Sequence, residues 1–128
     1  IVADKIFPYQ WDNKKPTAQM LGRWQPWHQG HQKLFEEIIK KTGQVNIMVR
    51  DVKGVGDNPF DFETVKKNII LALHQFKDRI KISLVPNLTN ICYGRGVGYT
   101  IEEIVLDKET QSISATKIRA ELRKQGKL

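Results

Sequence analysis

Apolar residues recur every three or four positions in three segments of the chain, the spacing of helices that bury one face. This spacing predicts a helix over 29–41 that ends at Gly43, and a second helix that begins near residue 60. Ser114 is placed to cap a third helix over 115–124. The faces that we expect in the core consist of Leu34, Phe35, Ile38, Ile39, Phe62, Val65, Ile69, Leu73, Phe76, Ile118 and Leu122.

Short apolar or alternating runs predict strands at 17–21, 45–49, 80–86 and 101–106. The connection between the first predicted helix and the strand after it is short, as in a βαβ unit with a right-handed crossover. We therefore expect a parallel sheet.

The chain of 128 residues is long enough for one domain with a real core. Residues 1–16 show neither the helical nor the strand spacing of apolar residues, so we expect an N-terminal arm or linker before a domain over 17–128. No apolar run approaches the ~20 residues of a membrane span, and no membrane partner is expected. The first residue is not Met, which leaves open whether the chain is processed or belongs to a longer protein. The sequence also leaves open whether the protein forms a homo-oligomer.

The charge balance favours anionic partners. The 21 Lys and Arg residues against 14 Asp and Glu residues give a net charge of +7, which suits nucleotides, nucleic acids or acidic lipid head groups. Cys92 is the only cysteine, which excludes an internal disulfide, and no charged-then-apolar leader precedes the first motif. We expect a reducing, cytoplasmic setting.

A strand end, a tight loop and the start of a helix meet in the sequence LGRWQPWHQGH. His28 and His31 lie at the predicted helix N-terminus, where free N–H groups and the helix dipole favour an anion. Gly22 and Gly30 permit close backbone approach, and Arg23 adds a permanent cation. This combination predicts a phosphate site.

Two other interpretations of the histidine pair are weaker. Zinc normally takes three or four ligands, and neither Cys92 nor His74 has ligand spacing, so we expect no metal bound by protein side chains. Isolated histidines are usually surface residues, but this pair has glycines and an arginine beside it.

A second anion-binding group is expected at the start of the last helix. Ser114, Thr116 and Arg119 bring two hydroxyls, free N–H groups and a guanidinium to one helix end. Two such helix ends that face each other would hold a triphosphate. Transfer of a phosphoryl-type group then requires positioning and charge neutralisation, and no protein nucleophile.

These two groups of residues lie in sequences that resemble the signatures of a known family. GRWQPWHQGH, from Gly22 to His31, resembles the GRxQPxHxGH signature of the HxGH nucleotidyltransferase superfamily, and ISATKIR, from Ile113 to Arg119, resembles its second signature, ISxTxxR. The resemblance covers roughly residues 17–126 and is closest to the archaeal-type nicotinamide-mononucleotide adenylyltransferases. It implies an α/β fold, a Rossmann-like three-layer sandwich with a parallel sheet of about five strands flanked by helices.

The resemblance also implies a reaction in which the acceptor's phosphate attacks the α-phosphorus, pyrophosphate leaves, and Mg²⁺ carried by the nucleotide bridges the phosphates. At the matching positions, His28 and His31 would donate to the α-phosphate, while Arg23 and the backbone near Trp24 would hold the phosphates. The resemblance assigns the leaving phosphates to Ser114, Thr116 and Arg119. The full set of expected nucleotide-binding residues is Gly22, Trp24, Gln25, Gly30, Ser114, Thr116, Tyr93 and Arg95, beside the catalytic His28, His31, Arg23 and Arg119.

Adenine is the expected base because GRWQPWH resembles the adenylyl branch, and because Lys108–Gln111 replaces the RTxG run of cytidylyltransferases. CTP stays open as the alternative. The base should lie over the first half of the first helix and beside the backbone from Tyr93 to Arg95. That glycine-rich segment lacks the full GxGxxG spacing and precedes no helix, so it is no dinucleotide fingerprint.

Acceptor-binding residues are expected after the second and third strands. Arg50 and Lys53, in a loop that is a candidate lid, suit a phosphate, although two solvated cations are an equal alternative. Asn87 follows the third strand. Asp57 stands where the similar nicotinamide enzymes carry a basic residue, so we expect a different small phosphorylated metabolite.

A non-catalytic nucleotide or single-stranded nucleic-acid binder is the rival function. It predicts basic patches dispersed among exposed aromatic residues. Since the two motifs cluster the chemistry instead, we favour an adenylyltransferase and expect no nucleic-acid partner.

Overall fold

The computed structural model describes residues 9–92, 94–95 and 100–128. Its elements in chain order are β1 (Ala18–Gly22), α2 (Gln29–Thr42), β2 (Val45–Arg50), α3 (Phe62–Ala72), the 3₁₀ helix η1 (His74–Arg79), β3 (Ile80–Val85), α4 (Lys108–Gln111) and α5 (Ala115–Lys124). This is an α/β fold, as the hydrophobic pattern predicts. Among these residues there is no helix of the length and hydrophobicity that a membrane crossing demands.

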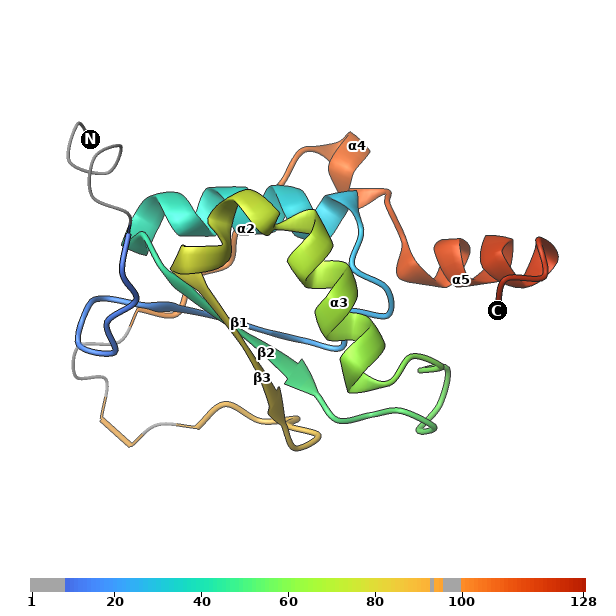
Figure 1. Cartoon of the computed structure of the whole chain (residues 1–128), viewed down its shortest axis with the longest axis horizontal. Coiled ribbons are helices and arrows are strands. Elements are labelled where there is room, and N and C mark those ends of the chain that lie inside the picture. The colour runs from blue at the N-terminus through green and yellow to red at the C-terminus, as the bar shows by residue number, and fades with distance from the viewer. Residues whose placement is uncertain (1–8, 93, 96–99) are drawn as a thin grey trace.

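The three strands form a parallel sheet in the order β1-β2-β3. Gly22 pairs with Val49, and Val49 pairs with Leu84, so the carboxyl ends of all three strands meet at one edge. The helices α2 and α3 lie on the same side of the sheet (Figure 1). This arrangement places the loops after β1, β2 and β3 side by side, where α/β sheets bind ligands.

The core confirms the first two predicted amphipathic helices, whereas Ile118 and Leu122 of the third, α5, are only half-buried and lie outside it. Phe35 of α2 and Ile69 of α3 are fully buried against the inner face of β2, whose Val45 and Ile47 are also fully buried. The predicted end of α2 is confirmed too, because Gly43 adopts the left-handed conformation (φ 82°) of a helix C-cap. The helical face predicted through Phe76 continues beyond α3 as a 3₁₀ turn.

The expected five-strand sheet is wrong for the described residues, in which three strands form the sheet. The segment 101–106 forms no strand, and its Glu102 pairs with Lys41 at the end of α2, with 3.1 Å between Nζ and Oε1. A strand requires a hydrogen-bonded neighbour, and alternation of side chains does not supply one. Asp107 then caps the short helix α4, where the sequence predicts only a polar connection.

The part of the N-terminal arm that the structure describes is tied to the domain by one buried amide. Gln44 accepts a hydrogen bond from the Tyr9 hydroxyl (2.8 Å), and it donates to the Asp12 carbonyl (2.8 Å) and the Thr17 hydroxyl (2.6 Å). Its own side chain is fully buried. Residues 9–17 therefore pack on the end of the sheet opposite to the carboxyl ends of its strands.

Candidate phosphate-binding site

His28 and His31 cap the first turn of α2 reciprocally. His28 is the N-cap residue, and its Nδ1 accepts hydrogen bonds from the N–H groups of Gly30 (3.0 Å) and His31 (3.4 Å). The Nδ1 of His31 accepts in return from the His28 N–H (3.1 Å). Both imidazoles thus take the roles that a serine and a glutamate have in an ordinary capping box.

This capping sets the tautomer of both rings. A neutral imidazole carries one proton, so a ring whose Nδ1 accepts must carry that proton on Nε2. The rings are stacked, with centroids 3.7 Å apart and planes 16° from parallel. We therefore assign to His28 and His31 two Nε2–H donors on one stack at the helix N-terminus.

Burial keeps the His31 ring neutral. Removal from water, and to a lesser extent repulsion from His28, lower the pKa of His31 to about 3. Burial also lowers the pKa of His28. Around His31 the ring of Trp24 lies edge-on, at 4.7 Å between centroids, and that of Trp27 lies at 5.5 Å. The pair can donate hydrogen bonds to an anion near neutral pH, and neither ring is a cation there.

The neutral His31 predicts a dependence of stability on pH. Its pKa is 6.5 in the unfolded chain and about 3 in the folded one, so between these values only the unfolded state binds the extra proton. The free energy of unfolding should therefore fall as the pH drops below 6.5, by about 1 kcal/mol at pH 5 after allowance for solvent screening. Urea unfolding of the wild type and of His31→Asn at pH 7.5 and pH 5 measures this contribution.

The His74→Gln variant serves as the control, since His74 is exposed on η1. An equal loss of stability in the wild type and in His31→Asn would contradict the assignment.

Two glycines of the first motif are required by close approach of aromatic rings. A Cβ on Gly30 would lie 2.8 Å from Cε1 of His28, and a Cβ on Gly22 would lie 2.7 Å from Cζ2 of Trp24. Gly30 therefore lets the His28 ring fold over the helix end. At both glycines, a side chain of the protein itself fills the space that a Cβ would need.

Gly30→Ala is expected to displace the His28 ring and, if the site holds the nucleotide that the resemblance implies, to weaken its binding about tenfold, although alanine is the better helix former. Binding of ATP, followed by calorimetry, measures the effect. Gly54→Ala is the control for backbone strain alone, since φ at Gly54 is 81° and an added Cβ there has no atom within 4 Å. Unchanged affinity in Gly30→Ala would show that the ring position is irrelevant.

Arg119 of the second motif contacts the backbone of the first. Ser114 caps α5 by accepting from the Lys117 N–H (3.4 Å). The guanidinium of Arg119 is buried, and its NH1 donates to the backbone carbonyl of Gln25, three residues before His28. Its NH2 donates to the hydroxyl of Thr116 (3.3 Å). The buried arginine thus joins the start of α5 to the loop that carries the histidine pair.

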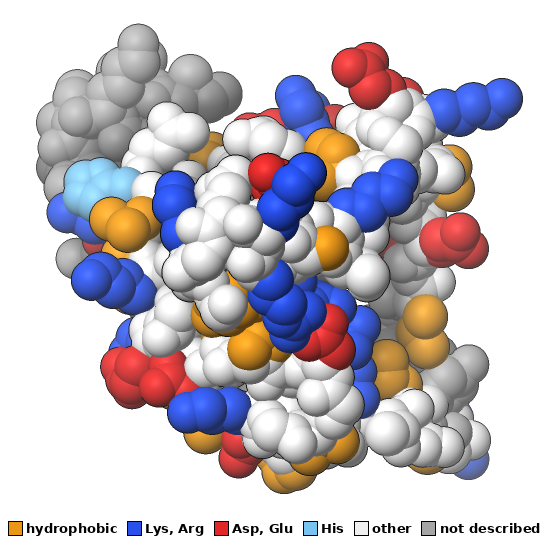
Figure 2. All heavy atoms as spheres, turned by 90° about the vertical axis from the view of Figure 1, so that its right-hand side faces the viewer, with side chains coloured by type: hydrophobic (Ala, Val, Ile, Leu, Met, Phe, Trp, Pro, Cys, Tyr) orange, Lys and Arg blue, Asp and Glu red, His pale blue; other side chains and the backbone are white. Residues whose placement is uncertain are grey.

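A third partner of Arg119 comes from the loop after β2. Asp57 accepts from Nε of Arg119 (2.9 Å) and from NH2 of Arg123 (2.5 Å). These hydrogen bonds, from Arg123 first and then from Arg119, lower the pKa of Asp57 to about 2, so its carboxylate stays ionised. Lys and Arg side chains gather on this face of the molecule (Figure 2).

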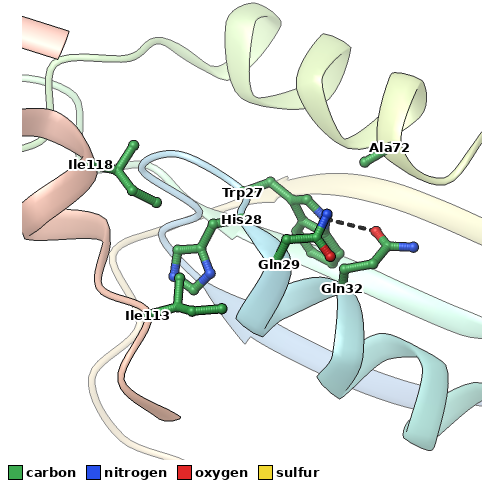
Figure 3. Close-up of a pocket in the computed structure, with 7 residues that line it drawn as sticks. All are labelled: Trp27, His28, Gln29, Gln32, Ala72, Ile113 and Ile118. Carbon is green, nitrogen blue, oxygen red and sulfur yellow. Dashed lines mark hydrogen bonds between the residues drawn. The ribbon is translucent and has the colours of Figure 1, made fainter. Parts of the chain in front are cut away.

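A pocket of about 390 Å³ lies between α2, α3 and α5. In Figure 3, His28 points toward Ile113, and Ile118 projects from α5 above it. The pocket is lined by Trp27, His28, Gln29, Gln32, Ala72, Ile113 and Ile118. Its wall therefore combines apolar side chains with the imidazole edge of His28.

Several other expected nucleotide-binding residues have internal roles. Trp24 is buried, and its Nε1 donates to the Met48 carbonyl (3.2 Å), so its ring is no open stacking surface. The amide of Gln25 pairs with both backbone groups of Phe60, at 2.9 Å each. Arg23 is exposed at the start of the loop.

The expected acceptor-binding residues come together in part. Arg50 donates to the side-chain oxygen of Asn87 (2.7 Å), which joins the ends of β2 and β3. Lys53 is exposed in the loop that follows Arg50, the last residue of β2. Arg95 is exposed in a bend, and Tyr93 lies outside the described residues.

Sequence reasoning missed Asp57 and Arg123 as members of the site. Arg123 lies four residues after Arg119 and so shares its helix face, a spacing that identifies the pair from the sequence. The pairing with Asp57, 62 residues before Arg119, has no local signal.

Within the described ranges, no group of three or more His, Cys, Asp or Glu residues is arranged to hold a metal ion. Comparison of the sequence with models of known protein families and with curated proteins finds no match.

Proposed function

We propose that the protein is a nucleotidyltransferase that transfers AMP from ATP to the phosphate of a small phosphorylated metabolite and releases pyrophosphate. An oxygen of the acceptor's phosphate forms a bond to the α-phosphorus, and the bond from that phosphorus to the bridging oxygen of the pyrophosphate breaks. The three-strand parallel unit with its crossover helices is compatible with the Rossmann-like fold that belongs to this proposal.

The observation that carries the proposal is the stacked histidine pair. Two neutral imidazoles whose Nδ1 atoms are engaged in capping present Nε2–H donors at a helix N-terminus. Fixed donors of this kind stabilise charge that develops on a phosphate oxygen, and removal of one typically costs about 10²–10³ in rate. Neither ring supplies a base, because in each one Nδ1 already accepts a hydrogen bond.

The surroundings of the pair suit the rest of a nucleotide. The pocket beside His28, with Ile113 and Ile118 in its wall, has the size and the apolar surface to receive a base. Arg119 and Thr116, in the first half of α5, would hold the leaving phosphates. Mg²⁺ would be carried by the phosphate oxygens and would neutralise part of their charge.

Release of pyrophosphate tests the proposal directly. The protein is incubated with ATP or CTP, Mg²⁺ and a panel of phosphomonoesters, and pyrophosphate is measured enzymatically. We expect release with ATP and at least one phosphomonoester. Release with CTP instead would identify a cytidylyltransferase. Tight binding of ATP with no release for any acceptor would overturn the proposal in favour of a nucleotide-binding module.

A further inference from the structure

Two arginines of α5 converge on one carboxylate. Asp57 engages Arg119 through Oδ2 at 2.9 Å, and it engages Arg123 through Oδ1 at 2.5 Å and Oδ2 at 3.3 Å. The two guanidinium groups differ in setting, since the Arg119 side chain is 5% exposed and that of Arg123 is 47% exposed. A buried and an exposed guanidinium thus hold one planar carboxylate between them, and guanidinium donors of this kind also suit phosphate oxygens.

The carboxylate occupies donors that a substrate requires under the proposed function. Arg119 uses NH1 for Gln25, NH2 for Thr116 and Nε for Asp57. Of these three partners, the Gln25 carbonyl belongs to the backbone of the loop over 23–28, and Thr116 belongs to the same helix as Arg119. Asp57 alone carries a charge, and it comes from a separate loop with an exposed side chain. It is therefore the partner that an anionic ligand can replace.

The exchange is electrostatically favourable. Asp57 brings one negative charge to two guanidinium groups, which leaves this three-residue cluster with a formal charge of +1. A terminal phosphate brings about two negative charges at neutral pH and offers three acceptor oxygens. The hydroxyl of Thr116, which accepts from Arg119, still has its own proton to donate to such a group.

The loop that carries Asp57 is anchored at its base. The Gln25 amide holds Phe60 through two hydrogen bonds, and Asn58 is buried with its Nδ2 donating to the Val55 carbonyl. Gly56, next to Asp57, has a positive φ of 62°. Release of the carboxylate therefore requires movement at the tip of the loop and no rearrangement of its attachment.

We infer that Arg123 and Arg119 together bind the terminal phosphate of a polyphosphate ligand, and that Asp57 holds this place in the free protein and gives it up when the ligand binds. This inference deepens the proposed function and rests on it for the identity of the nucleotide. Arg123 is a binding residue outside both motifs. Asp57 is an internal competitor that sets the affinity and excludes weaker anions.

Binding of inorganic tripolyphosphate tests this inference without any requirement for catalysis. Calorimetry is performed on the wild type, Asp57→Asn and Arg123→Gln. We expect Asp57→Asn to bind tripolyphosphate about tenfold more tightly than the wild type, and Arg123→Gln to bind it about tenfold more weakly. ATP should show shifts in the same directions.

Matched controls separate these effects from net charge. Asp51→Asn removes a carboxylate from the same loop, and Lys124→Gln removes a cation next to Arg123; each should change affinity less than twofold. Asp57→Ser provides a second neutral variant, and thermal unfolding shows whether each variant is folded.

A positioning role for Asp57 predicts the opposite sign. Weaker binding by folded Asp57→Asn or Asp57→Ser would overturn the inference, because it would mean that the carboxylate orients Arg119 for the ligand. Unchanged binding by Arg123→Gln would also overturn it. The proposed function fails separately: tighter tripolyphosphate binding by Asp57→Asn with no pyrophosphate release for any acceptor leaves the anion site standing and rejects the transferase.

Discussion

Replacement of His28 by asparagine is expected to lower the rate of the proposed AMP transfer by about 10²–10³-fold while the protein stays folded. Asparagine is a favourable N-cap residue, so its side-chain oxygen replaces Nδ1 as the acceptor for the N–H groups of Gly30 and His31. It carries no donor at the position of Nε2. The variant thus separates the two roles of His28, and pyrophosphate release together with urea unfolding measures both.

His28→Ala is the matched comparison. It removes the cap as well as the donor, and should lose the same activity together with about 1 kcal/mol of stability. If His28→Asn keeps wild-type activity, the imidazole serves only the helix and the histidine pair is not the catalytic group. The two variants should therefore lose activity equally, and His28→Ala alone should also lose stability.

Replacement of Arg119 by lysine is expected to loosen α5 and to weaken ATP binding more than tenfold. An ammonium group cannot serve the Gln25 carbonyl, the Asp57 carboxylate and the Thr116 hydroxyl with the planar spacing of a guanidinium. Because the side chain is buried, the groups left without partners should lower the free energy of unfolding by about 2–3 kcal/mol. Because α5 lies at the edge of the molecule (Figure 1), its backbone amides should exchange hydrogen faster in Arg119→Lys than in the wild type.

Hydrogen exchange measured by mass spectrometry, with urea unfolding and ATP calorimetry, follows these three effects. Lys124→Gln alters the charge of the same helix without touching the Arg119 contacts, and it should leave exchange in α5 unchanged. Wild-type protection of α5 in Arg119→Lys would mean that other contacts hold this helix in place.

The sequence predicts the regular elements closely where their signals are local. The apolar period and Gly43 place α2 within one residue of its bounds, and Ser114 marks the start of α5. The histidine pair is also a local feature, because N-cap and N3 positions lie three residues apart on one helical turn. The same local view fails at 101–106, where alternation predicts a strand and the chain forms none.

The sequence by itself determined α2, α3 and α5, the three parallel strands and the helix N-terminus at which His28 and His31 meet. Only the tertiary structure decided that Trp24 is buried, that Gln25 clamps Phe60, and that Asp57 lies between Arg119 and Arg123. The reason is physical: caps and amphipathic faces depend on residues within a few positions of one another. A contact across more than 60 residues depends on the path of the whole chain, which no short pattern encodes.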